Sequence, residues 1–189
     1  AAEIISSFVR ALLPHFSRIH ICGVTGNHGR IGRPGQHHPE TNGDRFVYEV
    51  LQHLLAGYQT LTWQMPQLGD TGWHTVDTIG KYSCLLVHGD QFGGSAGRGF
   101  PVTGQRNKVL GWLSMASQGH MPQFQDVAFG HYHHLTTHML NHGGVARGSG
   151  SVESSNDFAK EKCAAVSPPS QRLLFVQPST GQVASEVAP

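Results

Sequence analysis

The sequence predicts an α/β protein, because two kinds of apolar pattern alternate along its 189 residues. Short apolar runs of strand length are followed by longer segments whose apolar residues recur at helical spacing. Polar segments rich in glycine and proline separate them, as expected for turns and loops. A chain of this length can bury one sizeable core, which favours a single domain.

The first third of the chain predicts two helices and a strand between them. Residues 1–13 have apolar side chains at helical spacing, which indicates an amphipathic helix. Residues 19–24 form a short apolar run that leads into a turn, as a buried strand would. After a polar loop over residues 30–44, Asp44 is predicted to cap a helix over residues 45–55.

The remaining two thirds alternate in the same way. A glycine-rich loop is predicted over residues 91–105, followed by a helix over residues 107–118. Residues 151–171 are polar, which predicts a long loop, and the residues from Ser179 onward predict either a final hairpin or a tail. Strands are predicted over residues 61–65, 73–79, 82–87, 127–129, 135–140, 145–149 and 173–176.

Composition excludes several classes of protein. The formal net charge is +1, so the strongly basic surface of many nucleic-acid-binding proteins is absent. No apolar run approaches the ~18 residues that a membrane span needs, and no signal peptide is visible. The three cysteines, Cys22, Cys84 and Cys163, are widely separated and odd in number. This pattern favours reduced thiols in a cytosolic protein.

At three places, a residue able to bind a metal follows a predicted strand beside glycine. These places are Gly26-Asn27-His28, His88-Gly89-Asp90 and Gly130-His131-Tyr132-His133. Because ligands gather at strand ends in α/β sheets, these side chains are predicted to share one site. If the third segment stays extended, alternation places His131 and His133 on the same side. Imidazoles and an amide oxygen suit manganese, iron, zinc or nickel and fit calcium poorly.

These three segments resemble motifs of the calcineurin-like metallophosphoesterases. In that family, Gly-Asn-His-[Asp/Glu], a single histidine and Gly-His-x-His occur in the order seen here. The resemblance covers residues 1–178 as one metallophosphoesterase domain and leaves 179–189 as a tail or final hairpin. It implies a two-sheet β-sandwich flanked by helices, with the site on loops at strand ends. Residues 154–156 and 167–171 are similar to segments of phage-borne members.

The resemblance implies a role for each matching residue. Asn27, His88 and His131 would bind one divalent metal ion, and His133 would bind the other. His28 would be the catalytic acid that protonates the leaving group, or would stabilise the charged phosphorus centre. A water held between the two ions would attack the phosphorus.

Two features of the sequence depart from the family pattern. The Asp-x-His and Gly-Asp-x-x-Asp motifs are missing and would lie before Ala1, which predicts that the sequence begins inside a larger protein and is N-terminally truncated relative to the family. Gly29 and Arg30 stand where the family has an acidic residue that can orient the histidine. Arg30 is instead predicted to bind a substrate phosphate, for which its planar guanidinium is suited.

The predicted function is therefore metal-dependent phosphoester hydrolysis through a water activated by two metal ions. Manganese is the first choice of metal, with iron, zinc or nickel as alternatives. A phosphodiester in nucleic acid is the first choice of substrate, which makes the protein a phosphodiesterase or nuclease. No membrane partner is expected, and the predicted location is cytoplasmic, in the host if the gene is phage-borne. The alternative is a catalytically impaired remnant that serves as a structural or interaction module.

Other interpretations stay open. Taken singly, Asn27 can be a turn residue that tolerates left-handed backbone, and each histidine can be an ordinary residue at a strand end. Asp90 can hold His88 in the right tautomer or can be a surface turn residue. A protein phosphatase is a third candidate. A Ser-His-Asp hydrolase is disfavoured, because no Gly-x-Ser-x-Gly elbow is followed by a predicted helix.

Overall fold

The computed structural model describes residues 1–33, 35–38, 40–66, 71–93, 101–153, 157, 160–161, 166 and 168–187. The chain divides into two compact units, Ala1–Thr75 and Val76–Pro189, and each is described by itself. None of the helices in the described ranges is both long enough and apolar enough to cross a bilayer.

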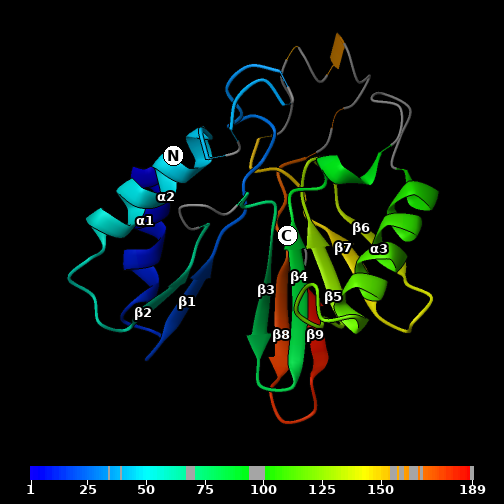
Figure 1. Cartoon of the computed structure of the whole chain (residues 1–189). Coiled ribbons are helices and arrows are strands. Elements are labelled where there is room, and N and C mark those ends of the chain that lie inside the picture. Colours follow the sequence, from blue (N-terminus) through cyan, green and yellow to red (C-terminus); the bar gives the residue numbers. More distant parts are fainter. Residues whose placement is uncertain are drawn as a thin grey trace. The chain divides into compact units, whose positions relative to one another are not determined.

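In the first unit, two helices accompany a two-stranded parallel sheet (Figure 1). In chain order the elements are α1 (Ala2–Leu12), β1 (Ile19–Cys22), α2 (Gly43–Leu54) and β2 (Leu61–Gln64). The two strands pair with Ile19 opposite Leu61 and Cys22 opposite Gln64. All four elements match predicted ones, with end points within about two residues, the usual uncertainty of helix ends.

The core of this unit lies between the helices and one face of the sheet. Val9, Leu51, Leu55 and Leu61 are buried together. Partly buried apolar residues pack around them, namely Ile5, Leu13, Ile19, Ile21 and Trp63. Since side chains alternate along a strand, β1 turns Ile19 and Ile21 toward the helices and presents His20 and Cys22 on the other face.

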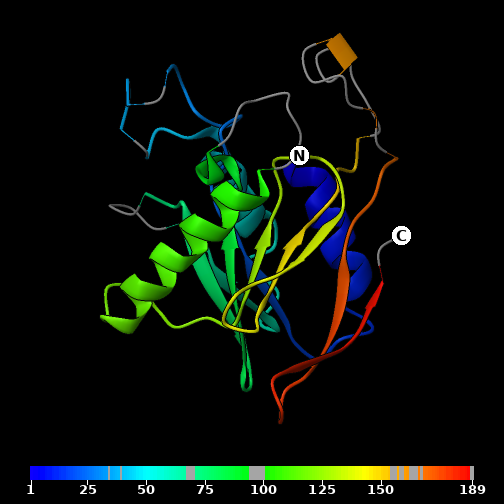
Figure 2. The same cartoon turned by 90° about the vertical axis from the view of Figure 1, so that its right-hand side faces the viewer.

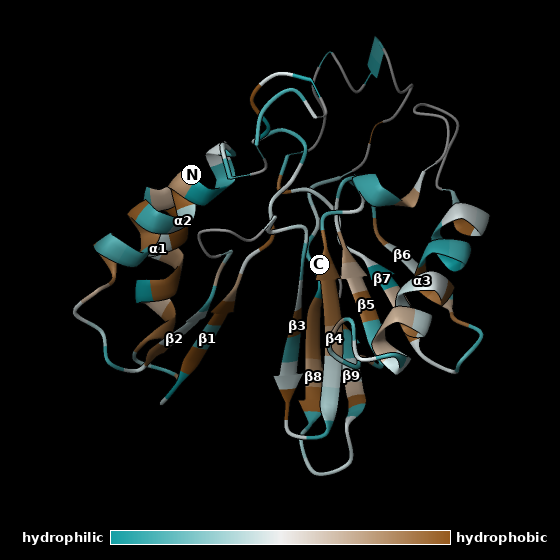
Figure 3. Ribbon diagram, viewed as in Figure 1, coloured by the Kyte–Doolittle hydropathy of each residue, from teal (hydrophilic) through white to brown (hydrophobic). Residues whose placement is uncertain are grey.

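Both helices of this unit carry hydrophobic residues beyond those that reach the core (Figure 3). Ile4 and Phe8 on α1 are 76% and 64% exposed, and Phe46 on α2 is 69% exposed. These three residues belong to the apolar patterns that predicted the helices. Helical spacing therefore identified the elements correctly but overstated how much of each helix is buried.

The cap of α2 differs from the prediction. The N-cap is Asn42, whose side-chain oxygen accepts a hydrogen bond from the Asp44 N–H at 2.8 Å. Asp44 lies in the first turn instead, and its carboxylate accepts from the backbone N–H of Gly26 at 2.7 Å. Asparagine and aspartate are about equally good caps, so their order alone did not reveal which of the two was used.

The second unit is built on a five-stranded mixed sheet in the order β3-β4-β5-β7-β6. Strands β4, β5 and β7 are mutually parallel, and β6 runs antiparallel to β7. Strands β8 and β9 form a separate antiparallel hairpin, in which the residues after Ser179 supply the second strand. The strands are β3 (His74–Ile79), β4 (Tyr82–Val87), β5 (Asp126–Phe129), β6 (Thr136–Met139), β7 (Val145–Gly148), β8 (Leu173–Gln177) and β9 (Gln182–Val187).

Different layers cover the two faces of this sheet, with helix α3 (Val102–Ser117) on one side and the β8–β9 hairpin on the other (Figure 2). On the helix side, Phe92 of the short 3-10 turn η1 (Asp90–Phe92) meets Trp112 of α3 and Phe129 of β5, at ring-centroid distances of 5.8 and 5.1 Å. The predicted α/β class is confirmed, as a mixed fold whose central mixed sheet is flanked by helical structure.

Helix α3 begins at Val102, whereas the sequence predicted glycine-rich loop up to residue 105. The reason is Gly104, where an added Cβ would lie 2.5 Å from the carbonyl oxygens of both Phe92 and Gly93. A glycine that suggested a loop instead lets the first turn of a helix pack directly on backbone. The rest of that predicted loop, residues 94–100, lies outside the described residues.

A buried ion pair joins two strands of the sheet, and its arginine also contacts the β8–β9 hairpin. Arg147 of β7 donates to the carboxylate of Asp126 on β5, and these residues are only 7% and 2% exposed. Asp126 also accepts from the Val145 N–H at 2.8 Å and the Tyr82 hydroxyl at 3.1 Å. The Nε of Arg147 donates to Glu186 of β9 at 3.0 Å. The charges are therefore paired and hydrogen-bonded, as buried charges must be.

Cys84 is expected to resist alkylation in the folded protein. It is buried in β4, and desolvation raises the pKa of its thiol to about 12. Because only the thiolate is a good nucleophile, iodoacetamide at pH 8 should leave Cys84 unmodified in the native protein and modify it after unfolding in urea. Peptide mapping by mass spectrometry measures both states. Full native alkylation would contradict the burial of this side chain.

Candidate metal centre

The loop that carries Asn27 and His28 is held by hydrogen bonds to the start of α2. The Gly26 N–H donates to Asp44, and the Gly26 carbonyl accepts from the Asn42 side chain at 3.0 Å. Just before them, the Val24 carbonyl accepts from the Tyr48 hydroxyl at 2.6 Å. Asn27 is half-buried and His28 is exposed, so this turn presents an amide and an imidazole from a backbone held on both sides.

In the second unit, the ends of two adjacent parallel strands bring His88 and His131 together. Strands β4 and β5 pair with Val87 opposite Phe129, and each histidine follows within two residues. The Nδ1 of His131 lies 3.2 Å from the Nε2 of His88, and the rings meet edge to face with centroids 5.0 Å apart. The sequence prediction that these two strand ends share a site is consistent with this geometry.

A glycine allows this approach. Gly89 has a φ of 116°, which L side chains rarely adopt, and an added Cβ would lie 3.1 Å from both the Gly130 carbonyl oxygen and the Cβ of His131. The Gly130 N–H in turn donates to the His88 carbonyl at 2.9 Å. A larger residue at position 89 would be strained by this φ and would require its neighbours to move by a few tenths of an ångström.

The backbone of the Gly-His-x-His segment is not extended, which contradicts one expectation from the sequence. His131 and His133 have φ values of 67° and 61°, in the left-handed region that non-glycine residues adopt infrequently. Strand β5 ends at Phe129, and the Tyr132 N–H donates to the Gly130 carbonyl at 2.8 Å, which makes a tight turn. Alternation therefore does not apply here. Backbone strain of this kind concentrates at functional sites.

The histidine pair fits one transition-metal ion. Two nitrogen ligands that are each ~2.1 Å from an ion lie about 3.0–3.4 Å apart, and the two ring nitrogens lie 3.2 Å apart. Within the described residues, no third His, Cys, Asp or Glu ligand atom lies within 4.8 Å of both. A pair of nitrogens at this spacing can supply two ligands to one ion. That Asn27 binds the same ion, that His133 binds a second ion and that His28 acts as the acid remain predictions. Asn27 and His28 belong to the first unit.

Asp90 and Tyr132 are close in sequence to the histidine pair and add a carboxylate and a hydroxyl beside it. Asp90 begins η1 directly after Gly89, and the Tyr132 hydroxyl donates to the Gly89 carbonyl at 3.4 Å. Burial, with the charge of Asp90 as a smaller cause, raises the pKa of Tyr132. Tyr132 therefore stays a neutral hydrogen-bond donor at physiological pH.

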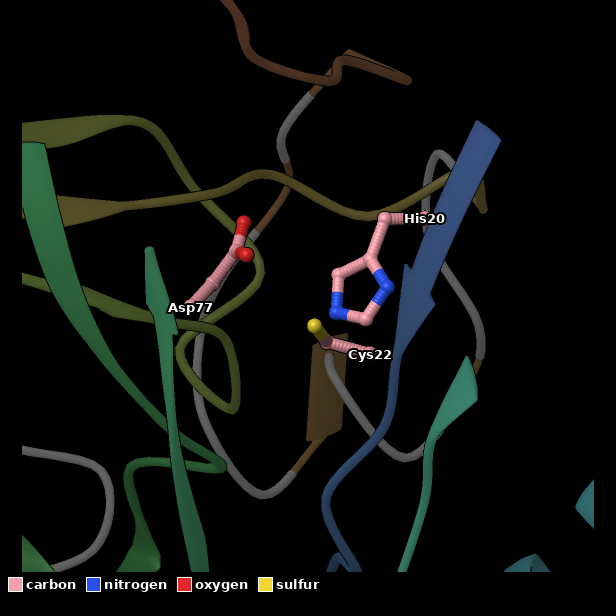
Figure 4. A group of neighbouring side chains, drawn as sticks. All are labelled: His20, Cys22 and Asp77. Atoms are coloured by element: carbon pink, nitrogen blue, oxygen red, sulfur yellow. The ribbon is translucent and has the colours of Figure 1, made fainter. Parts of the chain in front are cut away.

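Sequence analysis missed a second pair of ligand-type side chains, His20 and Cys22, which extend from the same face of β1 (Figure 4). Their ligand atoms lie within 4.8 Å of each other. The Nδ1 of His20 is 2.7 Å from the Thr62 hydroxyl, and Gln64 lies 3.5 Å from Nε2 of His20 and 3.9 Å from Sγ of Cys22. The His-x-Cys spacing within a predicted strand was the available signal. Asp77, also labelled in the figure, belongs to the second unit.

Comparisons with known proteins found similarity only among solved structures. No protein-family description and no curated protein matches the chain. Vps29 of Entamoeba histolytica in complex with Zn²⁺ is 18% identical, with 74% of this chain and 76% of that chain covered and a TM-score of 0.44. Vacuolar Protein Sorting 29 of Cryptosporidium parvum is 16% identical, with 77% and 75% covered and a TM-score of 0.43.

A conserved uncharacterised protein of Streptococcus pneumoniae, described as a predicted phosphoesterase, is 11% identical. It aligns with 100% of this chain and 91% of its own length, with a TM-score of 0.43. All of these likenesses are distant, so the function of this chain has to be inferred from its own residues.

Proposed function

We infer that the chain is a metal-dependent phosphoester hydrolase of the calcineurin-like metallophosphoesterase type. The observation that carries this proposal is the 3.2 Å approach of the His88 and His131 ring nitrogens at the ends of adjacent parallel strands. Two further features support it: the left-handed backbone at His131 and His133 and the order of the three sequence motifs. Residues held in sparsely populated backbone regions cluster at functional sites.

In this proposal, different residues bind the metal ions, donate the proton and bind the phosphate. Asn27, His88 and His131 hold one divalent ion, and His133 holds the second. Such ions acidify a water molecule and neutralise phosphate charge. His28, which is exposed on the loop that is hydrogen-bonded to α2, donates a proton to the leaving oxygen. Arg30, also exposed, pairs with a non-reacting phosphate oxygen through its planar guanidinium.

The finer assignments are part of the proposal. Manganese is the first metal to test, followed by iron, zinc and nickel, because imidazole and amide ligands suit all four. The first substrate to test is a phosphodiester, as in a nuclease acting in the cytoplasm. The net charge of +1 is too small for strong attraction to a whole nucleic acid, which favours recognition of the phosphate group itself.

Replacing His28 with alanine is expected to lower kcat on a bis-aryl phosphodiester by about 100-fold or more, because positioned proton transfer contributes that much. Metal content should not change, since His28 is assigned no metal. The measurement is steady-state kinetics with Mn²⁺ in excess, together with elemental analysis. The matched control is His53→Ala, which removes an exposed histidine from α2 of the same unit. Equal turnover in both variants would remove His28 from the acid role.

A panel of three substrates distinguishes phosphodiesterase activity from phosphomonoesterase and protein phosphatase activity. A bis-aryl phosphodiester, an aryl phosphomonoester and a phosphopeptide are offered to the same Mn²⁺-loaded protein. Fastest turnover of the diester supports a phosphodiesterase, whereas preference for the phosphopeptide favours a protein phosphatase.

A second candidate, a non-catalytic interaction module, is favoured by one observation. Ile4, Phe8 and Phe46 expose most of their apolar surface on the two helices of the first unit. Clustered exposed apolar side chains mark many protein–protein contacts. Metal binding without hydrolysis of any panel substrate would favour this candidate over the hydrolase.

A further inference from the structure

The residue after His28 is glycine for a steric reason. A Cβ added at Gly29 would lie 2.1 Å from the side-chain oxygen of Asn42, 2.6 Å from Cγ of Asp44 and 2.7 Å from Oδ1 of Asp44. Gly29 is not among the glycines with positive φ, so its backbone does not require glycine. The side chains of Asn42 and Asp44 therefore together occupy the space that a side chain at residue 29 would fill, and the carboxylate of Asp44 takes part of it.

We propose that Asp44 is a positioning residue for Asn27 and His28, and that its carboxylate, which comes from α2, replaces an acidic side chain at residue 29. The proposal rests on the proposed function, because it assigns Asp44 to the same site. The acidic residue that the resemblance leads one to expect after His28 is not lost but supplied from fifteen residues further along the chain, by the first turn of a helix.

The hydrogen bonds show how Asp44 acts on its neighbours. Its Oδ2 accepts from the Gly26 N–H at 2.7 Å, a charge-assisted bond of the stronger kind. The adjacent Asn42 donates to the carbonyl of the same residue at 3.0 Å. Both peptide groups of Gly26 are thereby fixed, and these set the direction in which the chain enters Asn27. The Gly43 N–H adds a bond to the Gly29 carbonyl at 2.6 Å, on the other side of His28.

The start of α2 is a favourable position for the negative charge of this carboxylate. Asp44 lies in the first turn of α2, where the exposed N–H groups of the helix favour a negative charge. Tyr48, one turn further along α2, anchors Val24 at 2.6 Å. Burial first, and then the charge of Asp44, raises the pKa of Tyr48 to about 12, so its hydroxyl remains a donor. The loop from Val24 to Gly29 is thus held along its length by one helix.

The first test compares Asp44→Ala and Asp44→Asn with Glu49→Ala, which removes an exposed carboxylate from the same helix. Amide exchange of Gly26, followed by NMR, should become at least about 10-fold faster in Asp44→Ala, because the Gly26 N–H loses its acceptor. Affinity for Mn²⁺ should fall by about 10- to 100-fold, as for loss of a residue that orients ligands. Asp44→Asn keeps an acceptor oxygen and should recover part of both effects.

The second test moves the carboxylate from residue 44 to residue 29. Gly29→Asp alone should be poorly tolerated, because the new side chain collides with Asp44 and Asn42. In the Asp44→Ala background the collision with Asp44 is removed while that with Asn42 remains, so the same substitution should be less harmful to the melting temperature and should restore part of the Mn²⁺ affinity, a coupling that a double-mutant cycle measures. If Gly29→Asp were equally harmful in both backgrounds, and stayed so after Asn42→Ala was added to each to remove the other collision, the claim that the side chains of residues 29 and 44 compete for one space would be overturned.

These readouts separate the positioning role from the proposed function. Unchanged Gly26 exchange in Asp44→Ala would overturn the role of Asp44, whatever the activity. Faster exchange with Mn²⁺ affinity and kcat equal to those of Glu49→Ala would show that Asp44 is structural only, which also overturns it. If the unmodified protein hydrolysed no phosphoester, the proposed function would fail, while exchange and metal affinity would still decide the role of Asp44.

Discussion

Replacing His131 with glycine is expected to abolish metal binding by the second unit while leaving its fold intact. The ring of His131 supplies one of two nitrogens that lie 3.2 Å apart, so its loss should lower affinity for Mn²⁺ or Zn²⁺ by at least about 100-fold. Glycine is the informative replacement because residue 131 has a φ of 67°. Relief of backbone strain and the greater freedom of the unfolded chain nearly cancel, so the free energy of unfolding should change by less than about 1 kcal/mol.

Isothermal titration calorimetry with each metal and thermal unfolding followed by circular dichroism are the two measurements. The control is His120→Ala, which removes an exposed histidine just beyond α3 in the same unit. His88→Ala should reproduce the loss of metal. Retention of full affinity by both His88→Ala and His131→Gly would show that the histidine pair is not a metal site, and the proposed function would lose the observation that carries it.

Replacing Arg147 with methionine is expected to cost about 3–5 kcal/mol of the free energy of unfolding, the usual result of breaking a buried ion pair on one side. Methionine keeps much of the side-chain volume, so the cost comes from charge rather than from a cavity. Among the described residues, Asp126, which is 2% exposed, would keep the Val145 N–H and the Tyr82 hydroxyl as partners. Glu186 of β9 would lose one donor at the same time and would keep its ion pair with Arg172.

Urea denaturation followed by tryptophan fluorescence measures this loss. Lys108→Met on the exposed face of α3 is the control and should change the free energy of unfolding by less than about 0.5 kcal/mol. Adding Asp126→Asn to Arg147→Met should recover part of the loss, because the buried charge is then gone and the acceptor oxygen remains. A cost in Arg147→Met no larger than that of Lys108→Met would mean that the pair contributes nothing to stability.

Much of the fold could be predicted because it depends on patterns within a few residues. Alternation and short apolar runs predicted β4 with the bounds that the structure has, and helical spacing predicted α1 and α2. The same patterns placed His88 and His131 at the ends of two strands. Once β4 and β5 are parallel neighbours, such residues must lie close together, so this part of the candidate site also followed from the sequence.

Other parts of the site depended on contacts between segments distant in the chain. Gly104 suggested a loop because its packing on the carbonyls of Phe92 and Gly93 leaves no local signal. Asn42 takes the capping role that was predicted for Asp44, and the carboxylate of Asp44 accepts instead from the N–H of Gly26, which is eighteen residues earlier in the chain. His131 and His133 adopt left-handed backbone, although nothing in Gly-His-x-His distinguishes a turn from an extended end.

The sequence by itself determined which segments become strands and helices and which side chains stand at their ends, because periodicity and turn residues act over short distances. The tertiary structure alone decided how those ends are held: which carboxylate faces Gly26, which glycine makes room for a histidine, and which backbone is strained. The physical reason is that a hydrogen bond or a close approach between residues far apart in the chain has no energy until folding brings both partners together.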